Sequence, residues 1–249
     1  MDTTFMSVLI PNTTTIAPSA VGDLVLNLDA STLSGADSSA VSSWAGSEGT
    51  YTAGQATGAK QPLLKTTAGP NSGKCVLFDG TDDCLTIPSF VSSSHLSVFV
   101  VYKKTTASTA LMGMIIEQSA AAAAGTPGFY LYEPGNAASV VAYGAVATQT
   151  LGTACWPSVG DWAVASMICN GTPSVYQNGV QMGIPAYSAT TAIVKGNTTA
   201  TLNIGSRNNG ASLPVGGSIA QILVFNRSIG LRTHAGIVEW LRLMHNLAF

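Results

Sequence analysis

The alternation of apolar and polar residues predicts β-strands through most of the chain. Over residues 24–28, leucines alternate with Val25 and Asn27, which is the period-two pattern of a half-buried strand. Continuous apolar runs at 96–102 and 111–117 predict well-buried strands. Further strands are expected at 162–169, 174–182, 201–206 and 218–226. Turn residues recur at short spacing between them, which favours a sandwich or jelly roll over alternating strand–helix units.

One turn and one helix have clear local signatures. Asn178-Gly179 lies between two apolar segments, and both residues tolerate the positive φ of a type I′ hairpin. Near the end of the chain, apolar residues recur at i, i+3 and i+4 spacing, so a helix is expected over about 230–247. These apolar residues are Ile237, Trp240, Leu241, Met244 and Leu247.

The first 21 residues differ in character from the rest. They are rich in Ser, Thr and Pro without a clear period, so 1–21 is expected to form an extended arm before a single domain at 22–249. The apolar residues of the arm are candidate assembly contacts, since an extended segment can add a strand to a neighbour's sheet. They are Phe5, Met6, Val8, Leu9 and Ile10. This patch is too short for a secretory signal, so we expect synthesis and retention in the cytoplasm.

Composition narrows the choice of partners. Only 9% of the 249 residues are charged, whereas about 25% is typical. The ten lysines and arginines are scattered and the net charge is −2, so a nucleic-acid partner is not expected. No apolar run approaches about 18 residues, so no membrane span is expected.

The order of several motifs resembles one fold family. DLVLNLDASTLSGADSSAVSSW (23–44), QATGAKQPLL (55–64) and CVLFDGTDDCLTIP (75–88) are similar to the opening of concanavalin A-like, laminin-G-like domains. Segment 162–183 resembles the Trp-led strand and Tyr-x-Asn-Gly hairpin of the same family, and 202–230 resembles its closing strands. The resemblance implies an all-β fold, an antiparallel two-sheet jelly-roll sandwich with a C-terminal helix. A ligand site does not transfer with it, because one fold supports many functions.

Three aspartates lie within five residues, at Asp79, Asp82 and Asp83. They occupy relative positions one, four and five, and Phe90 stands at position twelve, so the pattern is not that of an EF-hand calcium loop. Asp-Gly-Thr-Asp is ordinary turn chemistry. We therefore favour a hairpin of 76–78 against 83–87, with a looser calcium site as the minority alternative.

Catalysis is not expected. Glycosidases of the resembled superfamily place three carboxylates on one strand, and retaining hydrolysis needs two carboxyls about 5 Å apart. The best candidate strand begins at Glu117 and lacks both partner carboxylates. The three histidines have no metal-ligand spacing with the cysteines. The sequence thus predicts neither an enzyme nor a bound cofactor.

The cysteines are expected to be free and buried. In the predicted hairpin, Cys75 and Cys84 would be diagonal neighbours at roughly 7 Å, too far apart for a disulfide. Cys155 and Cys169 complete the set of four.

Two functions fit these features. A sugar-binding surface could use the aromatic residues Trp156 and Tyr187 with the loop Arg207-Asn208-Asn209, although an exposed aromatic can equally mark a protein interface. This alternative is an adhesin that binds host glycans.

The preferred hypothesis is a structural role. A nearly uncharged, Ser/Thr/Ala-rich jelly roll with an arm resembles virion proteins of tailed bacteriophages, where laminin-G-like domains occur as capsid decoration, head-fibre and tail components. The resemblance implies a non-enzymatic, oligomeric virion protein, with capsid decoration favoured and the major capsid protein as partner. Low charge suits dense packing, because neighbouring copies repel little.

Overall fold

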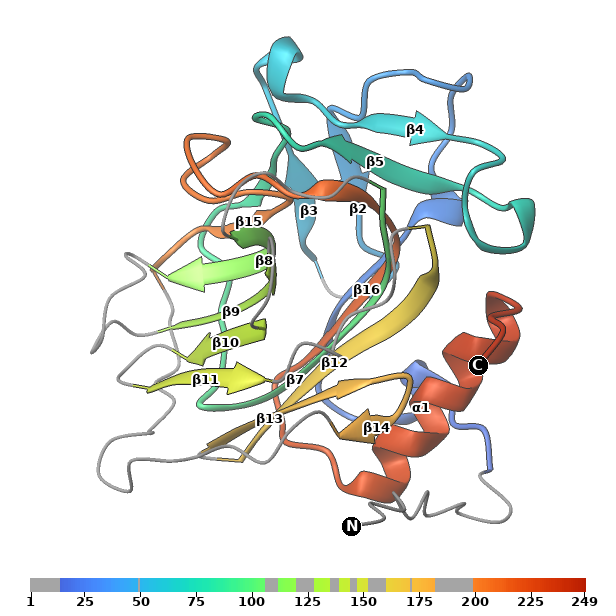
Figure 1. Cartoon of the computed structure of the whole chain (residues 1–249), viewed down its shortest axis with the longest axis vertical. Coiled ribbons are helices and arrows are strands. Elements are labelled where there is room, and N and C mark those ends of the chain that lie inside the picture. Colours follow the sequence, from blue (N-terminus) through green and yellow to red (C-terminus); the bar gives the residue numbers. More distant parts are fainter. Residues whose placement is uncertain are drawn as a thin grey trace, which may run out of the picture.

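Two antiparallel sheets pack face to face in the computed structural model of the chain (Figure 1). The structure describes residues 14–48, 50–105, 112–119, 128–134, 139–143, 147–151, 160–170, 172–181 and 199–249. The predicted fold class is confirmed: an all-β, two-sheet antiparallel sandwich followed by a C-terminal helix. The arm residues Phe5 to Ile10 lie outside the described residues, and the boundary at residue 21 stays a prediction.

The first sheet has the order β14-β13-β12-β7-β16-β5-β4, and β1 also pairs with β16. Its strands are β1 (Leu24–Asp29), β4 (Leu63–Lys65), β5 (Cys75–Asp79), β7 (His95–Lys104), β12 (Trp162–Asn170), β13 (Thr172–Gln177), β14 (Val180–Gln181) and β16 (Gly216–Phe225).

The second sheet has the order β11-β10-β9-β8-β15-β6-β3-β2. Its strands are β2 (Ser43–Ala45), β3 (Thr52–Gly54), β6 (Leu85–Ile87), β8 (Met112–Ser119), β9 (Gly128–Pro134), β10 (Ser139–Tyr143), β11 (Ala147–Leu151) and β15 (Leu202–Ile204). Among the described residues, the 3₁₀ turn η1 (Pro18–Ala20) precedes β1, and η2 (Ala30–Thr32), η3 (Gly58–Lys60) and η4 (Pro70–Ser72) lie between strands.

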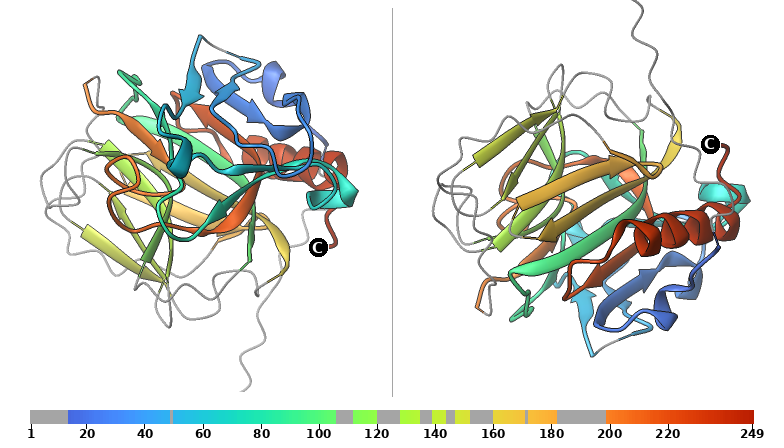
Figure 2. Two further views of the ribbon diagram at one scale, coloured as in Figure 1. Left: turned by 90° about the horizontal axis from the view of Figure 1, so that it is seen from above. Right: turned by 90° about the horizontal axis from the view of Figure 1, so that it is seen from below.

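The first sheet is apolar on both faces, which explains the unbroken apolar run of β7. Val98 and Val100 point into the core between the sheets, whereas Phe99 and Val101 point to the outer face. Helix α1 (Leu231–Met244) covers that outer face (Figure 2). Burial of Ile237 and Leu241 against it confirms the predicted amphipathic helix, whereas Met244, predicted on the same face, is exposed.

The end of the N-terminal segment is fixed on this helix. The Ile16 amide donates a hydrogen bond of 3.0 Å to the carbonyl oxygen of Gly236. A β-carbon on Gly236 would lie 2.6 Å from Cγ1 of Ile16, so the close approach requires glycine. Residues from Thr14 onward thereby gain a contact with the domain.

The Asn-Gly turn is confirmed and the aspartate hairpin is wrong. Asn178 and Gly179 have φ of 53° and 83° and join β13 to β14. By contrast, β5 pairs with β4 and β16 in the first sheet, whereas β6 pairs with β3 and β15 in the second. Asp79–Asp82 therefore carries the chain from one sheet to the other. Apolar alternation in both strands fits either pairing, so the pattern could not distinguish a hairpin from an arch.

Among the described residues, no helix is long and apolar enough to cross a membrane.

Candidate functional site

The outer face of the second sheet carries a polar cluster. Leu202 and Ile204 of β15 point into the core, so Asn203 between them points outward. Asn203 pairs with Thr86 on β6 and with Glu117 on β8. Polar side chains from three neighbouring strands are thus placed side by side.

A loop between β15 and β16 lies against this cluster. The amide of Asn209 donates to Oδ1 of Asn203 at 3.0 Å. Gln55 Nε2 donates to Oδ1 of Asn209 at 2.7 Å, and Lys60 Nζ donates to the Asn209 carbonyl at 2.9 Å. Gly210 has φ of +84°, and a β-carbon there would lie 2.3 Å from the Asp82 carbonyl oxygen. These contacts hold the loop in one position.

An ion pair lies beneath the loop. Arg207 Nε is 3.1 Å from Glu117 Oε1; the Glu117 side chain has no exposed area and Arg207 is 13% exposed. Tyr130, the β9 partner of Glu117, has a raised pKa because it is buried and close to the Glu117 charge. The guanidinium compensates the Glu117 carboxylate, so this residue is held as half of an ion pair.

The predicted sugar-contact residues are only partly brought together. Asn208 and Asn209 are exposed, with φ of 51° and 54°, whereas Arg207 turns inward to Glu117. Trp156 and Tyr187 lie outside the described residues, so their relation to the loop stays a prediction.

The three aspartates do converge. Asp79, Asp82 and Asp83 each place a carboxylate oxygen within 4.8 Å of the others, and they are the residues that could hold a cation. Asp79 Oδ1 accepts hydrogen bonds from the amides of Thr81 and Asp82, and Asp83 Oδ2 accepts from the amide of Asp79. Burial, together with the neighbouring Asp79 and Asp82 charges, raises the pKa of Asp83 to about 6. The carboxylates are thus already used to close the turn.

As predicted, the described cysteines are buried and outside disulfides. These are Cys75, Cys84 and Cys169, and Cys155 lies outside the described residues. Burial raises the pKa of Cys75 and Cys84, which keeps these thiols protonated. The predicted hairpin spacing is wrong, since Cys75 lies in β5 of the first sheet whereas Cys84 directly precedes β6 of the second.

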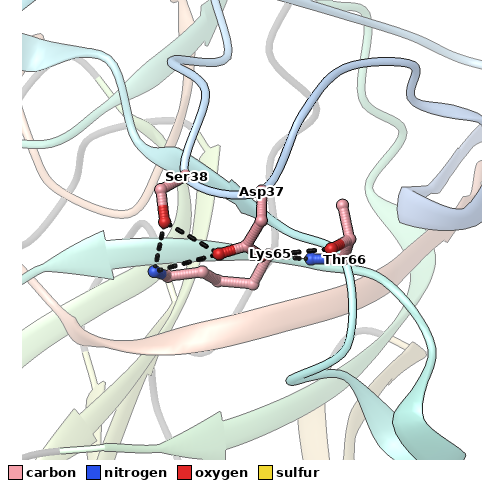
Figure 3. A network of polar contacts seen from close by, with 4 residues as sticks. All are labelled: Asp37, Ser38, Lys65 and Thr66. Carbon is pink, nitrogen blue, oxygen red and sulfur yellow. Dashed lines mark hydrogen bonds and ion pairs between the residues drawn. The ribbon is translucent and has the colours of Figure 1, made fainter.

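An exposed network around Asp37 was not predicted from the sequence. Asp37 accepts hydrogen bonds from the Thr66 amide at 2.8 Å and the Ser38 hydroxyl at 2.9 Å (Figure 3). Lys65 Nζ donates to Ser38 Oγ at 2.8 Å. The hydrogen bond from Thr66 is the main reason why the pKa of Asp37 is lowered. The network ties the connection before β2 to the end of β4.

Comparisons with known proteins support the fold. No protein-family model and no curated protein matches the chain. Solved structures do match, among them Trypanosoma rangeli sialidase in complex with 2,3-difluorosialic acid, at TM-score 0.61 and 12% identity over 88% of this chain and 33% of the sialidase chain. This chain therefore spans about a third of the length of the sialidase chains it matches.

Two other matches are a domain of an arabinanase and a toxin binding domain. Domain 4 of AbnA, a GH43 extracellular arabinanase from Geobacillus stearothermophilus, in complex with arabinotriose, matches at TM-score 0.53 and 15% identity over 87% of this chain and 98% of that domain. The botulinum neurotoxin serotype D binding domain matches at TM-score 0.56 and 12% identity over 89% and 52% of the two chains. Identities this low show a shared β-sandwich fold and nothing about activity.

Proposed function

We propose that this protein is a non-enzymatic structural component of a bacteriophage particle, specifically a capsid decoration protein or another surface component of the head or tail. The environment of Glu117 is the observation that supports the non-enzymatic part of this proposal. The carboxylate on the best candidate catalytic strand is fully buried, paired with Arg207 and lies beneath the loop after β15. Such a group supports the fold and is not poised to transfer a proton to a substrate.

Two features support a role in assembly. The chain has 12 acidic and 10 basic residues, so side-by-side copies repel little. The anchor of the N-terminal segment at Ile16 lies six residues after Ile10, the last candidate assembly residue of the arm. An arm that leaves the domain from a fixed point can reach a neighbouring subunit, and the proposed partners are the major capsid protein and further copies of this chain.

Removal of residues 1–13 tests the assembly role, because it spares Ile16 and its contact with Gly236. The full-length chain is expected to bind purified capsids or to self-associate in analytical ultracentrifugation. The truncated chain should melt at the same temperature but fail to bind or associate. Equal incorporation of both forms into particles would contradict the role of the arm.

A second proposed function is binding of glycans on a host surface. It is supported by sugar ligands in two structural neighbours, arabinotriose in the arabinanase domain and sialic acid in a Trypanosoma rangeli sialidase structure. The exposed amides of Asn208 and Asn209 suit hydroxyl groups, which both donate and accept hydrogen bonds. A glycan array with the wild-type protein and the Trp156→Ala and Asn208→Gly variants tests it; a blank array for the wild type would exclude it.

A further inference from the structure

A cleft of about 580 Å³ lies where four segments distant in sequence meet: η4, the start of β12, the β13–β14 turn and the residues after α1. Figure 2 shows η4 beside the C-terminal end of the chain in both views. The volume is within the usual range for small-ligand sites, roughly 300–1,000 Å³. This cleft, called here the β12/α1 cleft, is separate from the polar cluster around Asn203.

Aromatic and amide side chains dominate the lining of the β12/α1 cleft. Trp162 and Phe249 supply the aromatic part, and Phe249 is 40% exposed. Lys103 Nζ lies over the Trp162 ring, 5.0 Å from its centroid, and donates to the Ala68 carbonyl, which fixes the ring and the cation together. Asp161 is the only charged side chain among the described lining residues.

Three lining asparagines are placed by backbone turns. Asn71, Asn178 and Asn246 have φ of 51°, 53° and 48°, the left-handed conformation that asparagine tolerates. Two hydrogen bonds to Val164 hold Asn178. Its side-chain Oδ1 accepts from the Val164 backbone amide at 2.9 Å, and its backbone amide donates to the Val164 carbonyl at 2.9 Å. Its Nδ2 group therefore remains as a donor at the cleft.

A buried acceptor adds an independent observation. Gln177 lines the same cleft, and its Oε1 atom is buried without a hydrogen-bond partner among the described residues. A buried oxygen left unpaired costs about 1–3 kcal/mol, and a hydroxyl group from a ligand would satisfy it. The cleft thus offers both donors and acceptors next to aromatic carbon.

We propose that the β12/α1 cleft binds a neutral carbohydrate, and this inference rests on the second function proposed above. Sugar hydroxyls match amides because both groups donate and accept. Sugar C–H faces suit aromatic side chains, whose faces carry negative charge. An anionic ligand is disfavoured because the only charged side chain among the described lining residues is a carboxylate. A divalent cation is also disfavoured, because one carboxylate is too few to hold it.

Asn71→Gly/Asn246→Gly in the full chain tests the site. Glycine accepts positive φ, so the double variant removes two amides while keeping both turns. Ser89→Gly is the matched control, because Ser89 is exposed, also has positive φ and does not line the cleft; Asn208→Gly tests the loop after β15 as the alternative site. The probes are a glycan array of neutral and sialylated oligosaccharides, then titration calorimetry with the best neutral trisaccharide and with arabinotriose.

The expected result is binding of neutral glycans by the wild type, about tenfold weaker in the double variant and unchanged in Ser89→Gly. Binding that survives the double variant but is lost in Asn208→Gly would overturn the cleft and leave glycan binding intact. Binding of sialylated glycans alone would also overturn it. A wild-type protein that binds no glycan would overturn both the site and the second proposed function.

Discussion

Glu117 on β8 and Arg207 after β15 form an ion pair of 3.1 Å at the outer face of the second sheet. The pair joins a central strand to the loop that covers it. Removal of one partner of a buried ion pair leaves the other charge buried and uncompensated, which is strongly destabilising.

Arg207→Met should lower the free energy of unfolding by about 3–5 kcal/mol, because Glu117 would stay buried without its cation. The double variant Glu117→Gln/Arg207→Met should recover a large part of this loss. Urea denaturation of the single and double variants measures the difference. Equal stability of Arg207→Met and the double variant would contradict a charge-compensating role.

Asp83→Asn should stabilise the protein at neutral pH. The pKa of Asp83 rises from its ordinary 3.8 to about 6 on folding, mainly through burial. The folded state therefore holds this proton more tightly, and the resulting stability is complete below pH 4 and lost as the pH rises through about 6. Asparagine keeps an acceptor for the Asp79 amide without the charge.

The expected gain of Asp83→Asn is about 1–2 kcal/mol at pH 8, falling to nearly nothing at pH 4. Chemical denaturation at the two pH values measures it, and Asp161→Asn, at an exposed aspartate, is the control. A gain that is the same at both pH values would refute the assigned titration.

Titration of His234 should change stability with pH in the opposite direction to Asp83. It is buried in α1, with Nε2 2.8 Å from the Ser166 hydroxyl and its ring stacked on Phe99. Burial lowers its pKa from 6.5 to about 4. The unfolded state therefore binds the proton more readily, so stability is complete above pH 6.5 and lost as the pH falls toward 4.

His234→Gln, made in the Asp83→Asn background, should show a flatter pH dependence than that background alone. At pH 7 the free energy of unfolding of His234→Gln should be lower than that of the Asp83→Asn background. This difference should be about 2–3 kcal/mol smaller at pH 4. Denaturation curves at both pH values measure the change. A deficit independent of pH would mean that His234 does not titrate in this window.

Gly236→Ala should displace the N-terminal segment from α1. Its β-carbon would lie 2.6 Å from Ile16 Cγ1 and 2.8 Å from the Thr14 carbonyl oxygen. Alanine normally favours a helix by about 1 kcal/mol over glycine, so a loss of stability would come from this clash. Limited proteolysis should cleave Gly236→Ala near residue 16 faster than it cleaves the wild type. The control is Gly58→Ala, whose added β-carbon would meet no atom within 4 Å, and it should be cleaved at the wild-type rate.

Millimolar calcium should leave the melting temperature unchanged, because the carboxylates of Asp79 and Asp83 already accept backbone amides. Differential scanning fluorimetry with calcium and with magnesium measures this. A rise with calcium that disappears in Asp79→Asn would instead assign the acidic turn as a calcium site.

The sequence was sufficient for elements with a strong local pattern. Helix α1 follows from its apolar spacing, and the β13–β14 turn follows from Asn178-Gly179. Pairing of strands was harder, because the apolar alternation of β5 and β6 is the same whether they share a sheet or lie in two. The Glu117–Arg207 pair joins residues far apart in the chain, which no local pattern contains. The β12/α1 cleft depends on the same kind of long-range proximity.

The most direct test of the central claim is quantitative mass spectrometry of bacteriophage particles purified from a lysate in which this chain is produced, combined with immunogold labelling. The proposed function predicts the chain on intact particles at a fixed ratio to the major capsid protein, with label on the head surface. Recovery of the chain only in the particle-free fraction would contradict it.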